Sequence, residues 1–152
     1  MSTVDQVLAL ARSRIAGQAY AGAVTAREAF DLVQLDARIK LIDVRTNAER
    51  EWVGTVALPE GQHGAVQWST WPGGVPNPDF VQQLAAAAGK QDVLLFLCRS
   101  GVRSRHAAAL ATQHGFANSY DILEGFEGDK DGEGHRKSVG GWCHAGLPWL
   151  GA

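Results

Sequence analysis

Residues 93–97 form a short apolar run that ends at a cysteine and is followed at once by an alanine-rich helical pattern. An uninterrupted run of valine, leucine and phenylalanine is typical of a buried strand, and residues 102–114 favour a helix that closes at Gly115. A helix that follows directly on a buried strand restricts the chain to folds built from such units. It also places Cys98 where the strand ends and the helix N-terminus begins.

Further helix and strand patterns alternate along the rest of the chain. They predict helices over residues 4–17, 25–35 and 77–88, a strand over 41–44, a weaker strand over 65–68 and a strand over 119–123. The first helix has Ser2 or Thr3 as its cap, and Thr25 with Glu28 forms a capping box for the second. Asn77 followed by a proline is a start signal for the third. Alternating strands and helices predict an α/β fold with a mostly parallel sheet and helices on both faces.

Length, charge and cysteine content limit the classes of function. A chain of 152 residues can bury the core of one domain, and a net charge of −2 argues against nucleic acid as a bulk partner. No apolar run approaches the roughly 18 residues that a membrane span needs, so no membrane partner is expected. The first residues lack the pattern of a secretory signal, and two cysteines are too few for a disulfide framework. We therefore expect a cytoplasmic location.

The segment that follows residues 93–97 has the features of an anion site. Its residues are Cys98, Arg99, Ser100, Gly101, Val102, Arg103 and Ser104. Free backbone N–H groups, the positive end of a helix dipole and two guanidinium groups all favour a negative charge here. The same field favours the thiolate, which is the nucleophilic form of cysteine. We therefore predict a reactive thiol at Cys98.

Asp43 and Arg45 lie at the end of the predicted strand 41–44. In parallel sheets, ligands bind beyond the carboxyl ends of the strands. Because Cys98 also follows a strand, the two strand ends direct polar residues to one edge of the sheet. We expect Asp43 and Arg45 to brace the cysteine loop through hydrogen bonds and to take no direct part in the chemistry.

Four segments of the chain together resemble the single-domain rhodaneses, a family of sulfurtransferases. They are residues 41–46, 98–104, 125–128 and 141–149. The resemblance covers about residues 22–150 and implies a central, mostly parallel five-stranded sheet flanked by helices. It also implies a rhodanese domain over residues 22–152, with residues 1–21 as an N-terminal helical extension packed on it.

The resemblance implies that Cys98 carries sulfane sulfur as a persulfide. Its thiolate takes sulfur from a donor such as thiosulfate and passes it to a thiophilic acceptor such as cyanide or a thiol. Arg99 and Arg103 are expected to bind the donor, and the hydroxyls of Ser100 and Ser104 to hydrogen-bond the sulfur. Of the two arginines, Arg103 is the one more apt to be structural, because it enters the helix and its guanidinium could cap it or pair locally. No metal or organic cofactor is expected. A protein that supplies or removes the persulfide is a further possible partner.

Two other functions remain as alternatives. The cysteine loop also resembles that of dual-specificity phosphatases and arsenate reductases, in which five residues separate the cysteine from an arginine. Here four residues separate Cys98 from Arg103, which gives a smaller cradle that suits one sulfur atom. The second alternative is a non-catalytic rhodanese-like binding module, whose usual sign is loss of the cysteine. Because Cys98 is present, the sequence favours catalysis.

Other residues have both a structural and a chemical interpretation. We interpret Cys143 as an ordinary residue of a C-terminal helix, with a disulfide to Cys98 as the alternative. Residues 129–133 resemble part of a calcium loop but are expected to form a solvated turn. The tryptophans are expected to pack in the core and to hold loops in place. Trp68 and Trp71, in the Gly/Pro-rich segment 59–78, could also line the site.

Overall fold

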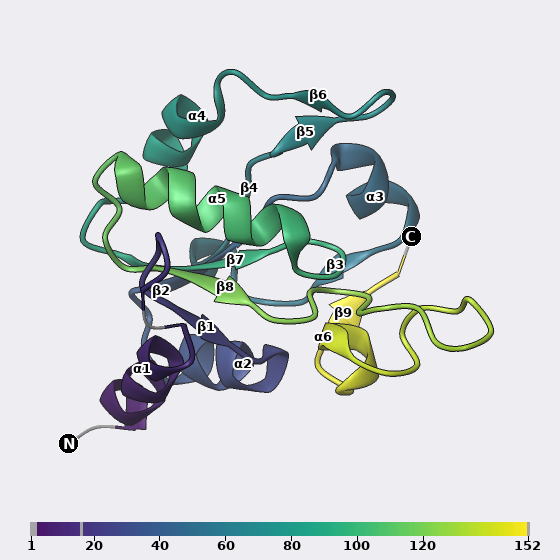
Figure 1. The fold of residues 1–152 in the computed structure, drawn as a ribbon, viewed down its shortest axis with the longest axis horizontal. Coiled ribbons are helices and arrows are strands. Elements are labelled where there is room, and N and C mark those ends of the chain that lie inside the picture. Colours follow the sequence, from purple (N-terminus) through teal and green to yellow (C-terminus); the bar gives the residue numbers. More distant parts are fainter. Residues whose placement is uncertain (1–2, 16, 152) are drawn as a thin grey trace.

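Five strands form a central sheet in the order β1–β8–β7–β2–β4 (Figure 1). The strands are β1 (Gly22–Val24), β2 (Ile39–Asp43), β4 (His63–Ala65), β7 (Val93–Leu97) and β8 (Ser119–Ile122). The structure is a computed structural model that describes residues 3–15 and 17–151. Every pairing in the central sheet is parallel, which confirms the predicted α/β fold.

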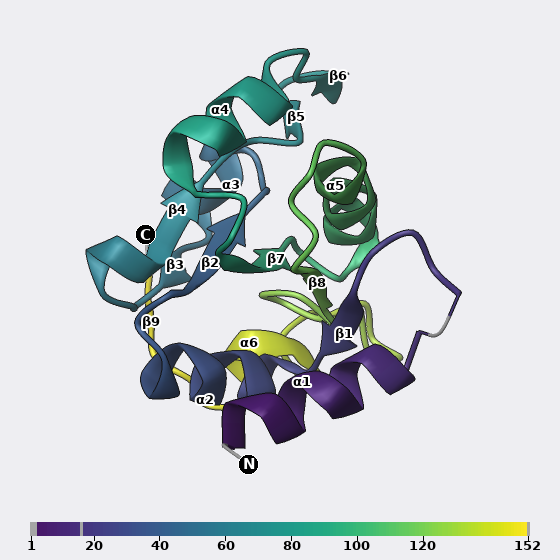
Figure 2. The same ribbon diagram turned by 90° about the vertical axis from the view of Figure 1, so that its left-hand side faces the viewer.

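Helices cover both faces of this sheet (Figure 2). One face carries α1 (Thr3–Ser13), α2 (Ala26–Leu35) and α6 (Gly141–His144), and the other carries α4 (Phe80–Ala87) and α5 (Val102–Gln113). The side chains of successive β7 residues pack alternately on the two faces of the sheet. Leu95 and Leu97 belong to one core cluster, whereas Leu94 and Phe96 belong to the other. Burial on both faces explains why this strand has no polar alternation in its sequence.

Short elements lie around the two edges of the sheet where its strands begin and end. They are α3 (Asn47–Trp52), β3 (Thr55–Val56), the 3-10 turn η1 (Glu60–Gln62), β5 (Ser69–Thr70), β6 (Val75–Pro76) and β9 (Trp149–Leu150). Strands β3 and β9 form one antiparallel pair, and β5 and β6 form another. None of these short elements was predicted from the sequence. Among the described residues, no helix is long and apolar enough to cross a membrane.

The elements with the clearest sequence signals lie where they were predicted. Strand β7 has the predicted bounds, and α5 ends one residue early. The capping box of α2 is also confirmed. The Thr25 hydroxyl accepts a hydrogen bond from the Glu28 N–H, and the Glu28 carboxylate accepts one from the Thr25 N–H. Each bond satisfies a donor at a helix start that otherwise has no partner.

Helix α1 is shorter than predicted, because it ends at Ser13 and not near Gly17. The next residue, Arg14, donates to the carbonyl of Ala23 and forms a bidentate ion pair with Glu28 of α2. These side-chain contacts connect the residue after the helix to β1 and α2. Thr3 lies within the helix and is not its cap. The alternative cap, Ser2, lies outside the described residues.

Three other predicted elements have the wrong bounds. Strand β2 spans Ile39–Asp43 and not residues 41–44. Helix α4 begins at Phe80, because the Asn77 carboxamide accepts a hydrogen bond from the N–H of Asp79 and closes a turn before the helix. The weak strand predicted over 65–68 is β4, which begins two residues earlier and ends at Ala65. The chain after β4 still lies along the sheet, where the N–H of Val66 donates to the carbonyl of Asp43.

Candidate active site

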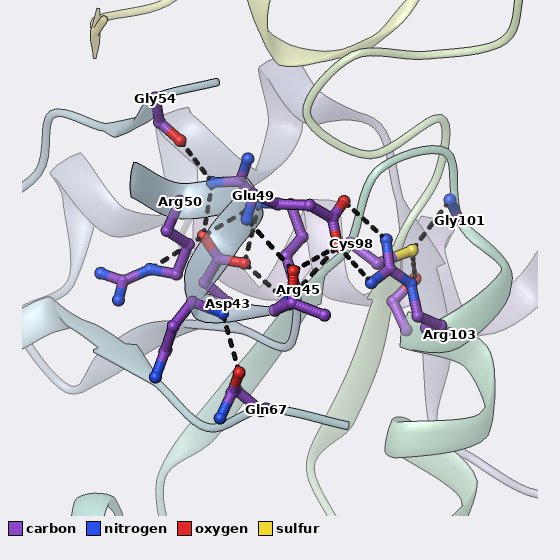
Figure 3. A network of polar contacts seen from close by, with 12 residues as sticks. Asp43, Arg45, Glu49, Arg50, Gly54, Gln67, Cys98, Gly101 and Arg103 are labelled. Carbon is purple, nitrogen blue, oxygen red and sulfur yellow. Dashed lines mark hydrogen bonds and ion pairs between the residues drawn. The ribbon is translucent and has the colours of Figure 1, made fainter. Parts of the chain in front are cut away.

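The cysteine loop (residues 98–104) leaves the carboxyl end of β7 and leads into α5 (Figure 3). The neighbouring strand β2 ends beside it, because Asp43 is paired with Leu97 in the sheet register. The side chain of Cys98 is buried, with 1% of its surface exposed. The topology thus places a buried thiol at the sheet edge where ligands of parallel sheets bind.

The loop provides two polar contacts to the sulfur of Cys98. The backbone N–H of Gly101 donates to Sγ at 3.0 Å, and the thiol donates to the hydroxyl oxygen of Ser104 at 3.3 Å. Gly101 precedes α5 with a φ of 110°, which side chains oppose and glycine accepts. The glycine in the loop is therefore needed to direct an N–H group at the sulfur. The other loop serine, Ser100, lines a separate hollow beside Gly101.

A second segment supports the cysteine loop through its backbone. The N–H of Phe126 donates to the carbonyl of Cys98 at 2.8 Å, and the N–H of Glu127 donates to the carbonyl of Arg99 at 3.0 Å. This close approach depends on Gly125, where a Cβ atom would lie 2.5 Å from the carbonyl oxygen of Cys98. The loop conformation is thus fixed by residues that lie beyond β8.

The two loop arginines have different surroundings. Arg99 is exposed, whereas Arg103 is half-buried and forms a bidentate ion pair with Glu49, at 2.6 and 2.9 Å. Burial acts to raise the pKa of Glu49, but hydrogen bonds and charge from Arg103 outweigh it and hold that pKa at about 2. Glu49 is therefore ionised at neutral pH and offsets the charge of Arg103.

Helix α3 positions Glu49. The Thr46 hydroxyl accepts from the Glu49 N–H at 3.1 Å, and the Glu49 carboxylate accepts from the Thr46 N–H at 3.2 Å. One carboxylate thus caps a helix and binds an arginine of the loop. Sequence reasoning missed Glu49, although its spacing from Thr46 is that of a capping box.

Asp43 and Arg45 form a fully buried ion pair. The Arg45 guanidinium donates to both carboxylate oxygens of Asp43 and to the carbonyl of Gly54, and it stacks on the ring of Phe126 at 4.2 Å. Because the N–H of Phe126 holds the carbonyl of Cys98, Arg45 is connected to the cysteine loop through Phe126 and not through the sulfur.

Asp121 is a second residue that the sequence did not reveal as part of the site. The Ser104 hydroxyl donates to Asp121 Oδ1 at 2.5 Å, and both side chains are buried. Burial raises the pKa of Asp121 to about 6. A charged residue in the apolar strand 119–123, next to the strand that precedes the cysteine, was the available signal. Its use required the strand order β8–β7, which the sequence does not give.

A cavity of about 520 Å³ lies beside the two loop arginines. Its walls include Arg99, Arg103, Trp52 and Trp71, and the two tryptophan rings meet edge to face at 6.3 Å. These tryptophans are 65% and 62% exposed, so the expectation that tryptophans pack the core is wrong for both. It holds for Trp142, which is fully buried. Segment 59–78 thus contributes part of the cavity wall.

Cys143 lies on α6 and packs against the core cluster on the sheet face away from α4 and α5. Cys98 belongs to the cluster on the other face. Burial raises the pKa of Cys143 to about 11, so this residue is a thiol at neutral pH. Both cysteines are unpaired. The position and protonation of Cys143 favour a structural role.

Residues 129–133 form a turn that is closed by Asp131. Its carboxylate accepts hydrogen bonds from the N–H groups of Glu133 and His135. Within the described ranges, no group of three or more histidine, cysteine or acidic side chains could hold a metal ion.

Comparison with known proteins identifies relatives of this chain. The family model described as "Rhodanese-like domain" matches residues 25–131. The uncharacterized protein RC0915 of Rickettsia conorii is 31% identical over 128 residues, which are 83% of this chain and 94% of that protein. Thiosulfate sulfurtransferase 16, chloroplastic, of Arabidopsis thaliana is 30% identical over 112 residues, 72% of this chain and 78% of that protein.

Two solved structures are informative. Rv0390 of M. tuberculosis is 39% identical, with a TM-score of 0.80 over 86% of this chain and 98% of that one. RPA3614 of Rhodopseudomonas palustris, described as a possible tyrosine phosphatase, is 22% identical, with a TM-score of 0.54 over 99% of this chain and 96% of that one. The second likeness shows a shared fold alone.

Proposed function

Because this chain belongs to the rhodanese-like family, a family of sulfurtransferases, we propose that it transfers sulfane sulfur from thiosulfate to a thiophilic acceptor through a persulfide on Cys98. The observation that carries the proposal is the surroundings of one sulfur atom. Cys98 Sγ lies between the N–H of Gly101 and the hydroxyl of Ser104, in a loop with two arginines. The N–H of Gly101 and the positive charge of the arginines stabilise an anionic sulfur, whether it is a thiolate or a persulfide, while Ser104 accepts from the neutral thiol.

The reaction has two nucleophilic steps. The Cys98 thiolate attacks the outer sulfur of thiosulfate, the sulfur–sulfur bond of the donor breaks, and sulfite leaves with the bonding electrons. The acceptor, for example cyanide, then attacks the outer sulfur of the persulfide and leaves as thiocyanate, which regenerates the thiolate. Ping-pong kinetics follow from this order. No step requires an oxidant or a metal.

The charge of the two arginines decides which donors bind well. Arg99 is exposed at the cavity, and we propose that it binds the sulfonate oxygens of the donor. Arg103 is already paired with Glu49, so less of its charge is available to a dianion. Glu49 therefore weakens the attraction of this site for thiosulfate.

Glu49→Gln is expected to raise kcat/KM for thiosulfate by about tenfold, because it removes the carboxylate that neutralises Arg103. Glutamine also fits the third position of a capping box, so α3 is retained. The matched control is Glu51→Gln, which removes an exposed carboxylate from the same helix and is expected to leave kcat/KM unchanged. A fall in kcat/KM for Glu49→Gln would show instead that Glu49 is needed to position Arg103.

The alternative function is phosphoryl or arsenate chemistry by the same loop. A phosphoryl group with three equatorial oxygens needs a wider ring of donors than one sulfur atom does. The spacing of four residues between Cys98 and Arg103 favours the smaller anion. Incubation with thiosulfate is expected to add one sulfur atom to the peptide that contains Cys98, with negligible hydrolysis of p-nitrophenyl phosphate. Cys98-dependent phosphatase turnover without a persulfide would contradict the proposal.

The acceptor and the cellular setting are part of the same proposal. The cavity of about 520 Å³ is within the size range of pockets for drug-sized ligands, so we propose a thiol with a carbon skeleton as the acceptor. A thiol on a protein partner suits the same chemistry. Because a thiol must stay reduced to accept sulfur, we place the reaction in the cytoplasm.

A further inference from the structure

A buried chain of hydrogen bonds leads away from the reactive sulfur. The Cys98 thiol donates to Ser104 Oγ at 3.3 Å, and the Ser104 hydroxyl donates to Asp121 Oδ1 at 2.5 Å. Each of the three residues is at most 1% exposed. The chain joins the end of β7 to α5 and to β8. It therefore connects the nucleophile to a carboxyl group on the neighbouring strand.

Asp121 lacks the partner that a buried carboxylate usually has. An ionised carboxyl group in a protein interior is normally paired with a cation. Within residues 3–15 and 17–151, Asp121 makes no ion pair at 4 Å or less. The titratable and charged groups that line its surroundings are Tyr20 before β1, Arg105 and His106 of α5, and Glu124 and Asp129 after β8. Its position suits a group that gains and loses a proton.

Asp121 also lies close to solvent. It lines one hollow of about 450 Å³ with Tyr20, Arg105 and His106, and a second of about 230 Å³ with Ser100 and Glu124. The tryptophan-walled cavity lies by Arg99 and Arg103 and does not include Asp121 in its lining. A proton on Asp121 is thus kept apart from the cavity that receives the donor.

We propose that Asp121 accepts the proton of Cys98 through Ser104, which rests on the sulfurtransferase function proposed above. The S–H bond of Cys98 breaks and its electron pair stays on sulfur. The proton goes to Ser104 Oγ, while the proton that Ser104 held goes to Asp121 Oδ1. The three groups carry one negative charge and the same number of protons before and after this shift. The proton returns along the same path when the enzyme reverts to the resting thiol.

The protonation of Asp121 fits this task. Burial raises its pKa to about 6, while the hydrogen bond from Ser104 and the charge of Arg105 act in the opposite direction. At pH 7 the carboxyl group is therefore mostly ionised and able to accept a proton. Below about pH 6 it already holds one. The route from Cys98 to Asp121 is thus lost as the pH falls through this value.

The test measures how fast iodoacetamide alkylates Cys98 between pH 5 and pH 10, with Cys143→Ser as the parent. Asp121→Asn keeps an oxygen that accepts from Ser104, but an amide does not take up the proton. We expect Asp121→Asn and Ser104→Ala to react roughly tenfold to a hundredfold more slowly at pH 7. At pH 10, where hydroxide removes the proton directly, the rates are expected to agree with the parent within about twofold. Asp129→Asn, which removes a nearby exposed carboxylate, is the control and is expected to match the parent throughout.

Three outcomes would overturn the proposal. The first is a parental pH profile in Asp121→Asn. The second is slowing by one factor at every pH, which indicates a structural role alone. The third is a parental profile in Ser104→Ala, which excludes the route and decides the matter if Asp121→Asn does not fold. Alkylation needs no sulfur donor, so an absence of sulfur transfer would refute the proposed function without touching this result.

Discussion

Cys98→Ser is expected to reduce sulfur transfer by about a thousandfold or more, because an alcohol is a far weaker nucleophile than a thiolate at neutral pH. The serine hydroxyl is polar and smaller than the thiol, so it leaves the hydrogen-bonding groups of Gly101 and Ser104 in place. The fold is therefore expected to be retained, which thermal melting checks. Thiocyanate formed from thiosulfate and cyanide measures the activity.

Cys143→Ser is the control for this substitution and is expected to keep most of the activity. Mass spectrometry of the donor-treated protein locates the added sulfur. If that sulfur is on Cys143, or if Cys98→Ser retains substantial transfer, the assignment of the nucleophile is wrong. The buried, protonated state of Cys143 is the physical reason for the expected result.

The largest effect on stability is expected from Arg45→Ala. It leaves the fully buried carboxylate of Asp43 with only the more distant Arg50, at 3.6 Å, as a cation, and it removes the bond to Gly54 and the contact with the Phe126 ring. Breaking one side of a buried ion pair lowers the free energy of unfolding by about 3–5 kcal/mol. Since a domain of this kind is stable by roughly 5–15 kcal/mol, urea denaturation will show the change clearly.

A matched control for this prediction exists in the same chain. Asp36 and Arg38 have the same spacing as Asp43 and Arg45, but the Arg38 side chain is 84% exposed. Arg38→Ala is therefore expected to change stability little, because water solvates both charges when the pair is broken. Equal losses in the two variants would contradict the importance of burial. A double replacement of Asp43 by asparagine and Arg45 by methionine leaves no buried charge and is expected to recover part of the loss.

The parts of the fold that could be predicted are those whose signals are local. The apolar run of β7 and the capping box of α2 each lie within a short contiguous segment, so their positions can be predicted from that segment alone. Strand β1 is only three residues long and exists because β8 lies beside it. Helix α3 had a local signal, the spacing of Thr46 and Glu49, that was overlooked.

The same division applies to the candidate site. Residues 98–104 are contiguous, and their composition indicates an anion site without knowledge of the fold. Glu49, Asp121 and Phe126 reach this loop from α3, from β8 and from the segment after β8, so their roles depend on the tertiary structure. Of the two arginines, the sequence singles out Arg103 as the one more apt to be structural, because it enters the helix and could pair locally. They differ because a carboxylate from α3 lies against Arg103 and not against Arg99.

The pairing of β1 with β8 has a consequence for the synthesis of the protein. Strands β2 and β7 lie between them in the chain, so translation delivers β1 long before its neighbour in the sheet. Cys98 likewise emerges before Asp121 and before the segment that binds its carbonyl. An unfinished chain therefore presents an uncovered thiol that the finished chain buries. Oxidants can therefore reach this cysteine until the ribosome has synthesised Asp121 and the segment that follows it.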